Sequence, residues 1–205
     1  MGVPTIELMQ WIGAIGIGLF YPIQNWRVFL TRKPIGLSFL GFSFIAVGVA
    51  GYLALGVRLA TPIFYVLNIS NLMFVTMLLL AMWFWSPSLK SWERVLGLLV
   101  LFVGLSGLAA VNLFAASIAT TTSGWIGLIG IVAFYPIQNT KLFLTRNPTG
   151  LSFVAFFSLF VGLCGLTAFG FLVDDITIIL GNGFTALGTL PILWGIVHWK
   201  KQPSN

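Results

Sequence analysis

"FYPIQN" occupies residues 20–25, and the same six residues return at 134–139, which is 114 positions later. Aligning the chain with itself at this offset places WIGAIGIGLFYPIQNWRVFLTRKPIGLSF (11–39) over WIGLIGIVAFYPIQNTKLFLTRNPTGLSF (125–153). From Trp11/Trp125 to Trp85/Trp199, 30 of the 75 aligned pairs are identical. The chain therefore contains an internal duplication, and an internal repeat has to be recognised before the elements are assigned.

The composition indicates that the repeated unit lies in a membrane. Of the 205 residues, 59% are hydrophobic and only 7% are charged, which is far too little charge for the surface of a soluble domain. A spanning helix needs roughly 20 consecutive apolar residues. The longest charge-free stretch, 95–140, is too long for one helix, and the TTTSG segment at 120–124 is expected to divide it in two. The sequence thus predicts an all-α membrane protein with seven transmembrane helices, from the charge-free stretches 8–26, 34–57, 59–89, 95–140, 147–173 and 176–199.

The repeat predicts how these helices are organised. We expect a first three-helix repeat at 5–86, an inside loop and linker helix at 87–118, and a second three-helix repeat at 122–200. Four membrane crossings separate equivalent points of the two copies, so the repeats are parallel. This is a 3+1+3 arrangement, a plan known among transporters built from parallel repeats.

The cations predict an orientation. Nine of the ten Lys and Arg follow the first, third, fifth or seventh predicted helix, and Arg58 alone lies on the other side. Because cytoplasmic loops are enriched in Lys and Arg, we expect the N-terminus outside and the C-terminus, with Lys200 and Lys201, in the cytoplasm. We also expect an integral protein of the plasma (inner) membrane. The net charge of +6 is then a topology signal, and no nucleic-acid partner is expected.

The layout and its motifs resemble a known family. The 3+1+3 plan, a proline-and-glutamine element in the first helix of each unit, and a following basic loop that ends in GLSF resemble the SWEET/SemiSWEET (MtN3) sugar transporters of the PQ-loop superfamily. The element reads Pro22-Ile23-Gln24 in one copy and Pro136-Ile137-Gln138 in the other. Many SWEETs carry a proline early in the second helix of each unit, where this chain has Gly41 and Ala155. The resemblance implies passive transport (uniport) of mono- or disaccharides by alternating access.

A pair of asparagines forms the candidate substrate site. Asn68 and Asn182 occupy equivalent positions inside their helices, although the surrounding sequences have diverged. A buried amide is costly in a membrane unless it meets another helix or a watery cavity, and its donors and acceptor match sugar hydroxyls. The resemblance implies a sugar-binding Asn in the third helix of each unit. Asn71 and Thr185, one turn further in, extend the predicted polar lining; a purely interhelical amide bond is the alternative.

An aromatic residue is a further candidate contact for the sugar. The family tends to place a Trp sixteen residues before the asparagine, and counting back gives Tyr52 in the first copy and Leu166 in the second. Tyr52 could stack on a sugar face, whereas Leu166 could not. A packing role for Tyr52 is the alternative.

The duplicated hexapeptide supplies candidate moving parts. A proline inside a helix frees the carbonyl four residues earlier, so Pro22 and Pro136 are candidate hinges, with a static kink as the alternative. The polar residues that follow them could close an inner gate across the pseudo-two-fold axis or simply bond neighbouring helices: Gln24, Asn25, Gln138 and Asn139.

The sequence carries no pattern of catalytic or metal-binding residues inside a predicted span. We therefore expect no enzyme, no metal and no cofactor, with the sugar and the lipid bilayer as partners; a homo-oligomer is compatible with the sequence. Two alternatives remain open. One is a PQ-loop carrier for amino acids or another small metabolite, which often needs a membrane-embedded acid. The other is a non-transporting receptor or scaffold, since the KDEL receptors resemble the same fold.

Overall fold

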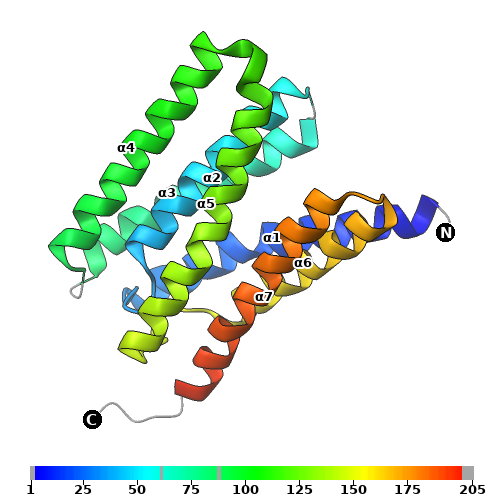
Figure 1. Ribbon diagram of the computed structural model, residues 1–205. Coiled ribbons are helices and arrows are strands. Elements are labelled where there is room, and N and C mark those ends of the chain that lie inside the picture. Colours follow the sequence, from blue (N-terminus) through cyan, green and yellow to red (C-terminus); the bar gives the residue numbers. More distant parts are fainter. Residues whose placement is uncertain (1–2, 61, 87–88, 200–205) are drawn as a thin grey trace.

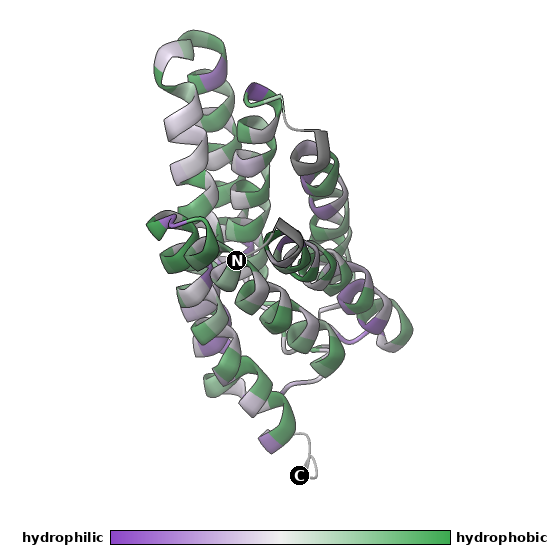
Figure 2. Ribbon diagram, turned by 90° about the vertical axis from the view of Figure 1, so that its right-hand side faces the viewer, coloured by the Kyte–Doolittle hydropathy of each residue, from purple (hydrophilic) through white to green (hydrophobic). Residues whose placement is uncertain are grey.

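The computed structural model describes residues 3–60, 62–86 and 89–199, and within these ranges all regular structure is helical. Each of the seven helices is long and apolar enough to cross a membrane, as the hydropathy colouring of Figure 2 illustrates. Helices suit this solvent because they satisfy their backbone polar groups internally. The predicted all-α membrane protein with seven transmembrane helices is confirmed: α1 (Val3–Thr31), α2 (Phe39–Arg58), α3 (Pro62–Trp85), α4 (Ser91–Phe114), α5 (Ala116–Thr145), α6 (Phe153–Leu172) and α7 (Ile176–Trp199).

The helices form two equivalent bundles and a linker (Figure 1). In the first unit α3 packs against both α1 and α2, and in the second α7 packs against both α5 and α6. The units meet through two equivalent contacts, α1 with α6 and α2 with α5, as a pseudo-two-fold axis requires. Helix α4 packs on α2 and α5. This is the predicted 3+1+3 architecture with parallel repeats.

Glycines let the two units approach closely. A Cβ atom on Gly16 of α1 would lie 2.5 Å from the Cα atom of Gly162 in α6. The equivalent atom on Gly130 of α5 would lie 2.6 Å from the Cα atom of Gly48 in α2. These backbones touch directly, as in other membrane helix pairs that meet through small residues. Even an alanine at either position would force the units apart.

The helix break between α4 and α5 lies earlier than expected. The TTTSG segment at 120–124 is helical and belongs to α5; α4 ends at Phe114, and Ala115 forms the break. Long-range hydrogen bonds account for the position. Arg58 donates from Nε to the Asn112 side chain (2.7 Å) and from Nη2 to the Asn112 carbonyl (2.9 Å), a carbonyl that the end of α4 leaves without a helical partner. Asn112 in turn donates to the hydroxyl of Ser123, which is buried.

Arg58 therefore has a structural role. A cation at a helix C-terminus is favoured by the helix dipole, so Arg58, the one Lys or Arg at its end of the described chain, stabilises the corner between α4 and α5. The other cations of the described chain lie where α1, α3 and α5 end and α2, α4 and α6 begin, which we term the basic end. The helices converge there, toward the lower left of Figure 1. Lys200 and Lys201 lie outside the described residues.

Candidate functional site: a paired closure at the basic end

Two short loops, equivalent by the repeat, meet at the basic end. The first follows α1 and the second follows α5; Arg32 and Arg146 start them in left-handed conformation, with φ of 50° and 48°. Each loop then turns through a proline, because the Leu37 N–H donates to the Pro34 carbonyl (3.1 Å) and the equivalent bond runs from Leu151 to Pro148 (2.9 Å). The duplicated "P-x-G-L-S" therefore encodes the same turn twice.

The following serines start the second helix of each unit. Ser38 accepts a hydrogen bond at its Oγ from the Gly41 N–H (3.1 Å), and Ser152 accepts one from the Ala155 N–H (3.3 Å). These are N-cap interactions, which satisfy donors that the first helical turn leaves unpaired. A proline at either donor position has no N–H to give. Gly41 and Ala155 thus donate the capping bonds of α2 and α6.

The loops contact one another across the pseudo-two-fold axis. The N–H of Gly36 in the first loop donates to the carbonyl of Thr149 in the second (2.8 Å). Gly150 adopts φ of +95°, and a side chain there would collide with the Lys33 carbonyl. Glycine is the residue that reaches this conformation without strain. The close approach of the loops therefore depends on glycine.

Each loop is held by a glutamine of the opposite unit. Gln138 of α5 donates from Nε2 to the Gly36 carbonyl (2.7 Å) and accepts at Oε1 from the Ser38 N–H (2.8 Å). Gln24 of α1 makes the equivalent pair, donating to the Gly150 carbonyl and accepting from the Ser152 N–H (2.9 Å). Both glutamine side chains are completely buried. We term this set, Gln24, Gln138 and the segments 34–38 and 148–152, the latch.

The neighbouring asparagines act within their own units. Asn25 donates from Nδ2 to the carbonyl of Phe74 in α3 (3.0 Å), and Asn139 donates to the carbonyl of Gly188 in α7 (3.0 Å). In the described part of the chain the Oδ1 atom of each asparagine is buried without a hydrogen-bond partner. The two glutamines thus bond across the pseudo-two-fold axis, the two asparagines bond the first helix of each unit to its third, and each asparagine keeps an unused acceptor.

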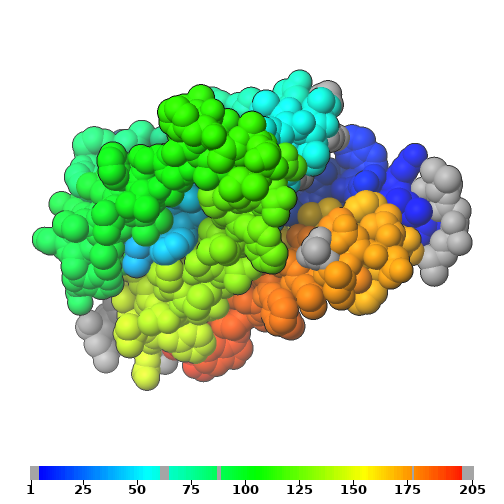
Figure 3. All heavy atoms as spheres, turned by 45° about the horizontal axis from the view of Figure 1, so that its top comes forward, coloured from blue at the N-terminus to red at the C-terminus, as the bar shows by residue number. Residues whose placement is uncertain are grey.

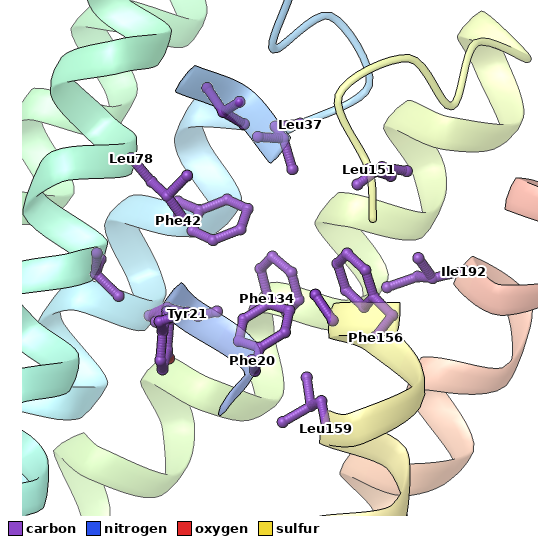
Figure 4. Close-up of a cluster of buried hydrophobic side chains, with 14 of the residues drawn as sticks. Phe20, Tyr21, Leu37, Phe42, Leu78, Phe134, Leu151, Phe156, Leu159 and Ile192 are labelled. Carbon is purple, nitrogen blue, oxygen red and sulfur yellow. The ribbon is translucent and has the colours of Figure 1, made fainter. Parts of the chain in front are cut away.

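An aromatic layer lies one turn beyond the latch (Figure 4). Phe20 of α1 meets Phe156 of α6 edge to face at 5.0 Å between ring centroids, and Phe42 of α2 meets Phe134 of α5 at 5.1 Å. All four rings are buried. Edge-to-face packing of buried rings adds about 0.5–1.5 kcal/mol to the burial itself. The basic end is therefore closed twice, by hydrogen bonds and by aromatic packing.

The two candidate hinges lie inside continuous helices. Pro22 is within α1 and Pro136 within α5, each two residues before its latch glutamine. A third proline beyond the first turn of its helix, Pro191 in α7, has no counterpart in α3, where Met77 occupies the equivalent position. Because proline cannot donate to the preceding turn, α1 and α5 each lack a backbone hydrogen bond close to the latch.

The predicted substrate residues lie apart from the latch. Asn68 and Asn71 are buried in α3, while Asn182 is half-buried in α7 and donates to the Ile178 carbonyl one turn earlier (2.9 Å). The buried hydroxyl of Thr185 lies 3.0 Å from the Gly181 carbonyl. None of these four residues lines either of the two cavities described below.

Tyr52, the fifth candidate, packs on the opposite unit. A Cβ atom on Gly127 of α5 would lie 2.8 Å from the half-buried Tyr52 ring. By the repeat, Leu166 covers Gly13 of α1 in the same way. The two side chains therefore occupy equivalent places at the helix interfaces.

One ion pair was not foreseen from the sequence. Lys141 of α5 donates to both carboxylate oxygens of Glu93 in α4, at 2.9 and 3.1 Å, and both side chains are largely buried. The two residues are 48 positions apart on different helices, so no local pattern pairs them. The described residues hold no group of three metal-ligating side chains.

The fold and the latch define a seven-helix integral membrane protein made of two parallel units that close on each other at one end. No model of a known protein family matches the chain, and no curated protein matches it. A solved structure of a eukaryotic SWEET transporter is similar, with a TM-score of 0.63 over 97% of this chain and 98% of that one, at 13% sequence identity. The chain therefore has a SWEET-like fold.

Proposed function

We propose that the protein is a passive carrier (uniporter) of mono- or disaccharides that works by alternating access. The observation that carries the proposal is the latch. Two buried glutamines each clamp a loop of the opposite unit, so the basic end opens only when both units give up the same set of hydrogen bonds. The conformation described is then the one closed at the basic end, and rocking of the parallel units opens it.

The unpaired polar atoms near the latch support a neutral, hydroxyl-rich substrate. Asn25 and Asn139 each keep a buried acceptor without a partner, and such an atom costs about 1–3 kcal/mol unless a donor reaches it. Sugar hydroxyls are donors of this kind. Asn68 and Asn182 are the proposed binding residues, assisted by Tyr52, Asn71 and Thr185. In this scheme the sugar passes from the asparagine pair to the latch as the closure releases.

Glu93 is the observation that favours the alternative, a proton-coupled carrier for amino acids. Its carboxylate is buried in the first turn of a spanning helix, and a group that changes charge inside a membrane is the usual means of coupling to protons. The two hydrogen bonds from Lys141 neutralise it, which supports a fixed structural role and hence uniport.

Uptake into liposomes tests the substrate class. Purified protein would be reconstituted and offered radiolabelled glucose, sucrose and a panel of amino acids, with protein-free liposomes as the blank. We expect uptake of at least one sugar and of none of the amino acids. Uptake of amino acids alone would contradict the sugar carrier and favour the amino-acid carrier.

We propose the plasma (inner) membrane as the location, with the basic end in the cytoplasm. Cysteines placed singly at exposed Asp174 and Lys33, at opposite ends of the bundle, test the orientation in a Cys164→Ala background. An impermeant thiol reagent applied to intact cells should label the first cysteine and not the second. The reverse pattern would invert the orientation.

A further inference from the structure

A groove runs along one side of the molecule between α4 and α5. It holds an apolar cavity of about 420 Å³ toward the middle of the helices and a second of about 540 Å³ at the basic end. In Figure 3 the light-blue surface of α2 shows between α4 (green) and α5 (yellow-green), as the floor of the groove.

The two cavities lie on the same faces of the three helices. Within each cavity the lining residues of a helix recur at intervals of three or four positions, which keeps them on one side of that helix. From one cavity to the other this side is kept: Phe44 is four positions from Leu40 on α2, Leu99 is seven (two turns) from Trp92 on α4, and Ile137 is seven from Gly130 on α5. The cavities are therefore successive parts of one groove.

The cavity at the basic end carries the chemistry of an anion site. Lys90 and Lys141 line it together with the hydroxyl groups of Thr140 and Thr145. Glu93 is already held by Lys141 in two hydrogen bonds, so that pair is neutral. Lys90 is exposed and forms no ion pair among the described residues. One positive charge is left over, at the N-cap position of α4, where that membrane-spanning helix begins.

The length of the groove matches one leaflet. From Glu93 to Gly107, a residue lining the apolar cavity, α4 rises by about 21 Å at 1.5 Å per residue. Half of the hydrocarbon core is about 15 Å thick, so the rest of this rise, a few ångströms, reaches into the headgroup layer. A phosphate can lie there at the level of the lysines. We propose that the groove binds one anionic phospholipid of the leaflet at the basic end. Its phosphate meets Lys90, and an acyl chain fills the apolar cavity.

This occupant would also contact the latch. Ile35 and Ser38 line the same cavity, and the Ser38 N–H donates to Gln138. The groove belongs to one side of the molecule only, because α4 packs on α2 and α5 and has no equivalent on α1 and α6. The linker helix therefore creates a lipid site that the duplicated units alone do not have.

Retention of lipid by the purified full chain tests the proposal. The protein would be equilibrated with equal amounts of phosphatidylglycerol and phosphatidylcholine of identical chains, and the lipids that remain bound would be counted by native mass spectrometry. We expect one bound phosphatidylglycerol per protein, preferred about five-fold over phosphatidylcholine. This is the factor that corresponds to the contribution of one lysine near an anionic surface. Equal retention of the two lipids would overturn the proposal.

Two variants locate the site. Lys90→Gln should abolish the preference, whereas Arg27→Gln, which removes an exposed cation at the same end from the position equivalent to Lys141, should keep it. Gly107→Phe should lower retention of both lipids, because a Cβ atom there points into open space and the ring would fill the apolar cavity without displacing a neighbour. Its fold is checked by size exclusion and thermal unfolding.

Three results would contradict the assignment. The first is equal behaviour of Lys90→Gln and Arg27→Gln. The second is a preference for phosphatidylethanolamine that Glu93→Gln removes, since the headgroup amine would then be the recognised part. The third is a dimer that Gly107→Phe dissociates, which would assign the groove to a second copy of the chain.

Discussion

Replacing Gln138 by alanine should open the basic end. The substitution removes the bonds to the Gly36 carbonyl and the Ser38 N–H, and in the closed conformation both groups are then buried without that partner. Each unpaired group costs about 1–3 kcal/mol, while in the open conformation water reaches them. The two groups together therefore make closing less favourable by about 2 kcal/mol at the lower limit, which lowers the ratio of closed to open protein by a factor of roughly 30. A protein that is about 95% closed would become about 40% closed.

Distances between spin labels measure this population. Labels at Lys33→Cys and Arg146→Cys lie at the basic end on opposite units, in a Cys164→Ala background. We expect one short distance in the parent protein and a second, longer distance in the Gln138→Ala variant. Asn139→Ala is the matched control, because its hydrogen bond stays within the second unit. Identical distance distributions in the two variants would refute the assignment of Gln138 to a latch.

Two further predictions concern packing and binding. Gly16→Ala should lower the stability of the folded protein by about 1–3 kcal/mol, because the added Cβ atom meets backbone that cannot move aside. Gly18→Ala is the control: its Cβ atom would have only a leucine side chain at 3.8 Å, so its stability should be unchanged or rise by about 0.5–1 kcal/mol. Thermal unfolding in detergent compares the two variants, and equal midpoints would contradict the close helix contact. Asn68→Ala and Asn182→Ala should each reduce sugar uptake strongly while the protein stays monodisperse, because hydroxyl groups of the bound sugar lose their hydrogen-bond partners. Uptake at the parental rate in either variant would assign that residue to packing.

The duplication made most of the fold predictable. Six charge-free stretches of membrane-spanning length, the longest of which (95–140) has room for two helices, give the helix number, and the 114-residue offset relates the latch contacts as well as the sequence. Gln24 and Gln138, for instance, make the same two bonds in opposite directions. The break at Ala115 was not predictable, because it depends on Arg58 reaching a helix end 54 residues away along the chain. Threonines such as those at 120–122 then continue a helix that local propensity alone would interrupt.

The hexapeptide shows where sequence reasoning about the site stops. Gln24 and Asn25 are adjacent and both polar, so the sequence offers both for the same role. Neighbouring positions on a helix point about 100° apart, and this rotation sends the glutamine to the opposite unit and the asparagine to α3. Only the packing of the helices decides which of the two crosses the pseudo-two-fold axis. The pairing of Glu93 with Lys141 likewise depends on where α4 packs.

The final level of sugar inside proteoliposomes tests passive transport most directly. Radiolabelled sugar would be followed to its plateau with no gradient, with an imposed pH gradient, and with a membrane potential, each against protein-free liposomes. A uniporter whose buried carboxylate is fixed in an ion pair brings the internal concentration to the external one under all three conditions, and a protonophore changes nothing. Accumulation above the external concentration that a protonophore collapses would contradict the account.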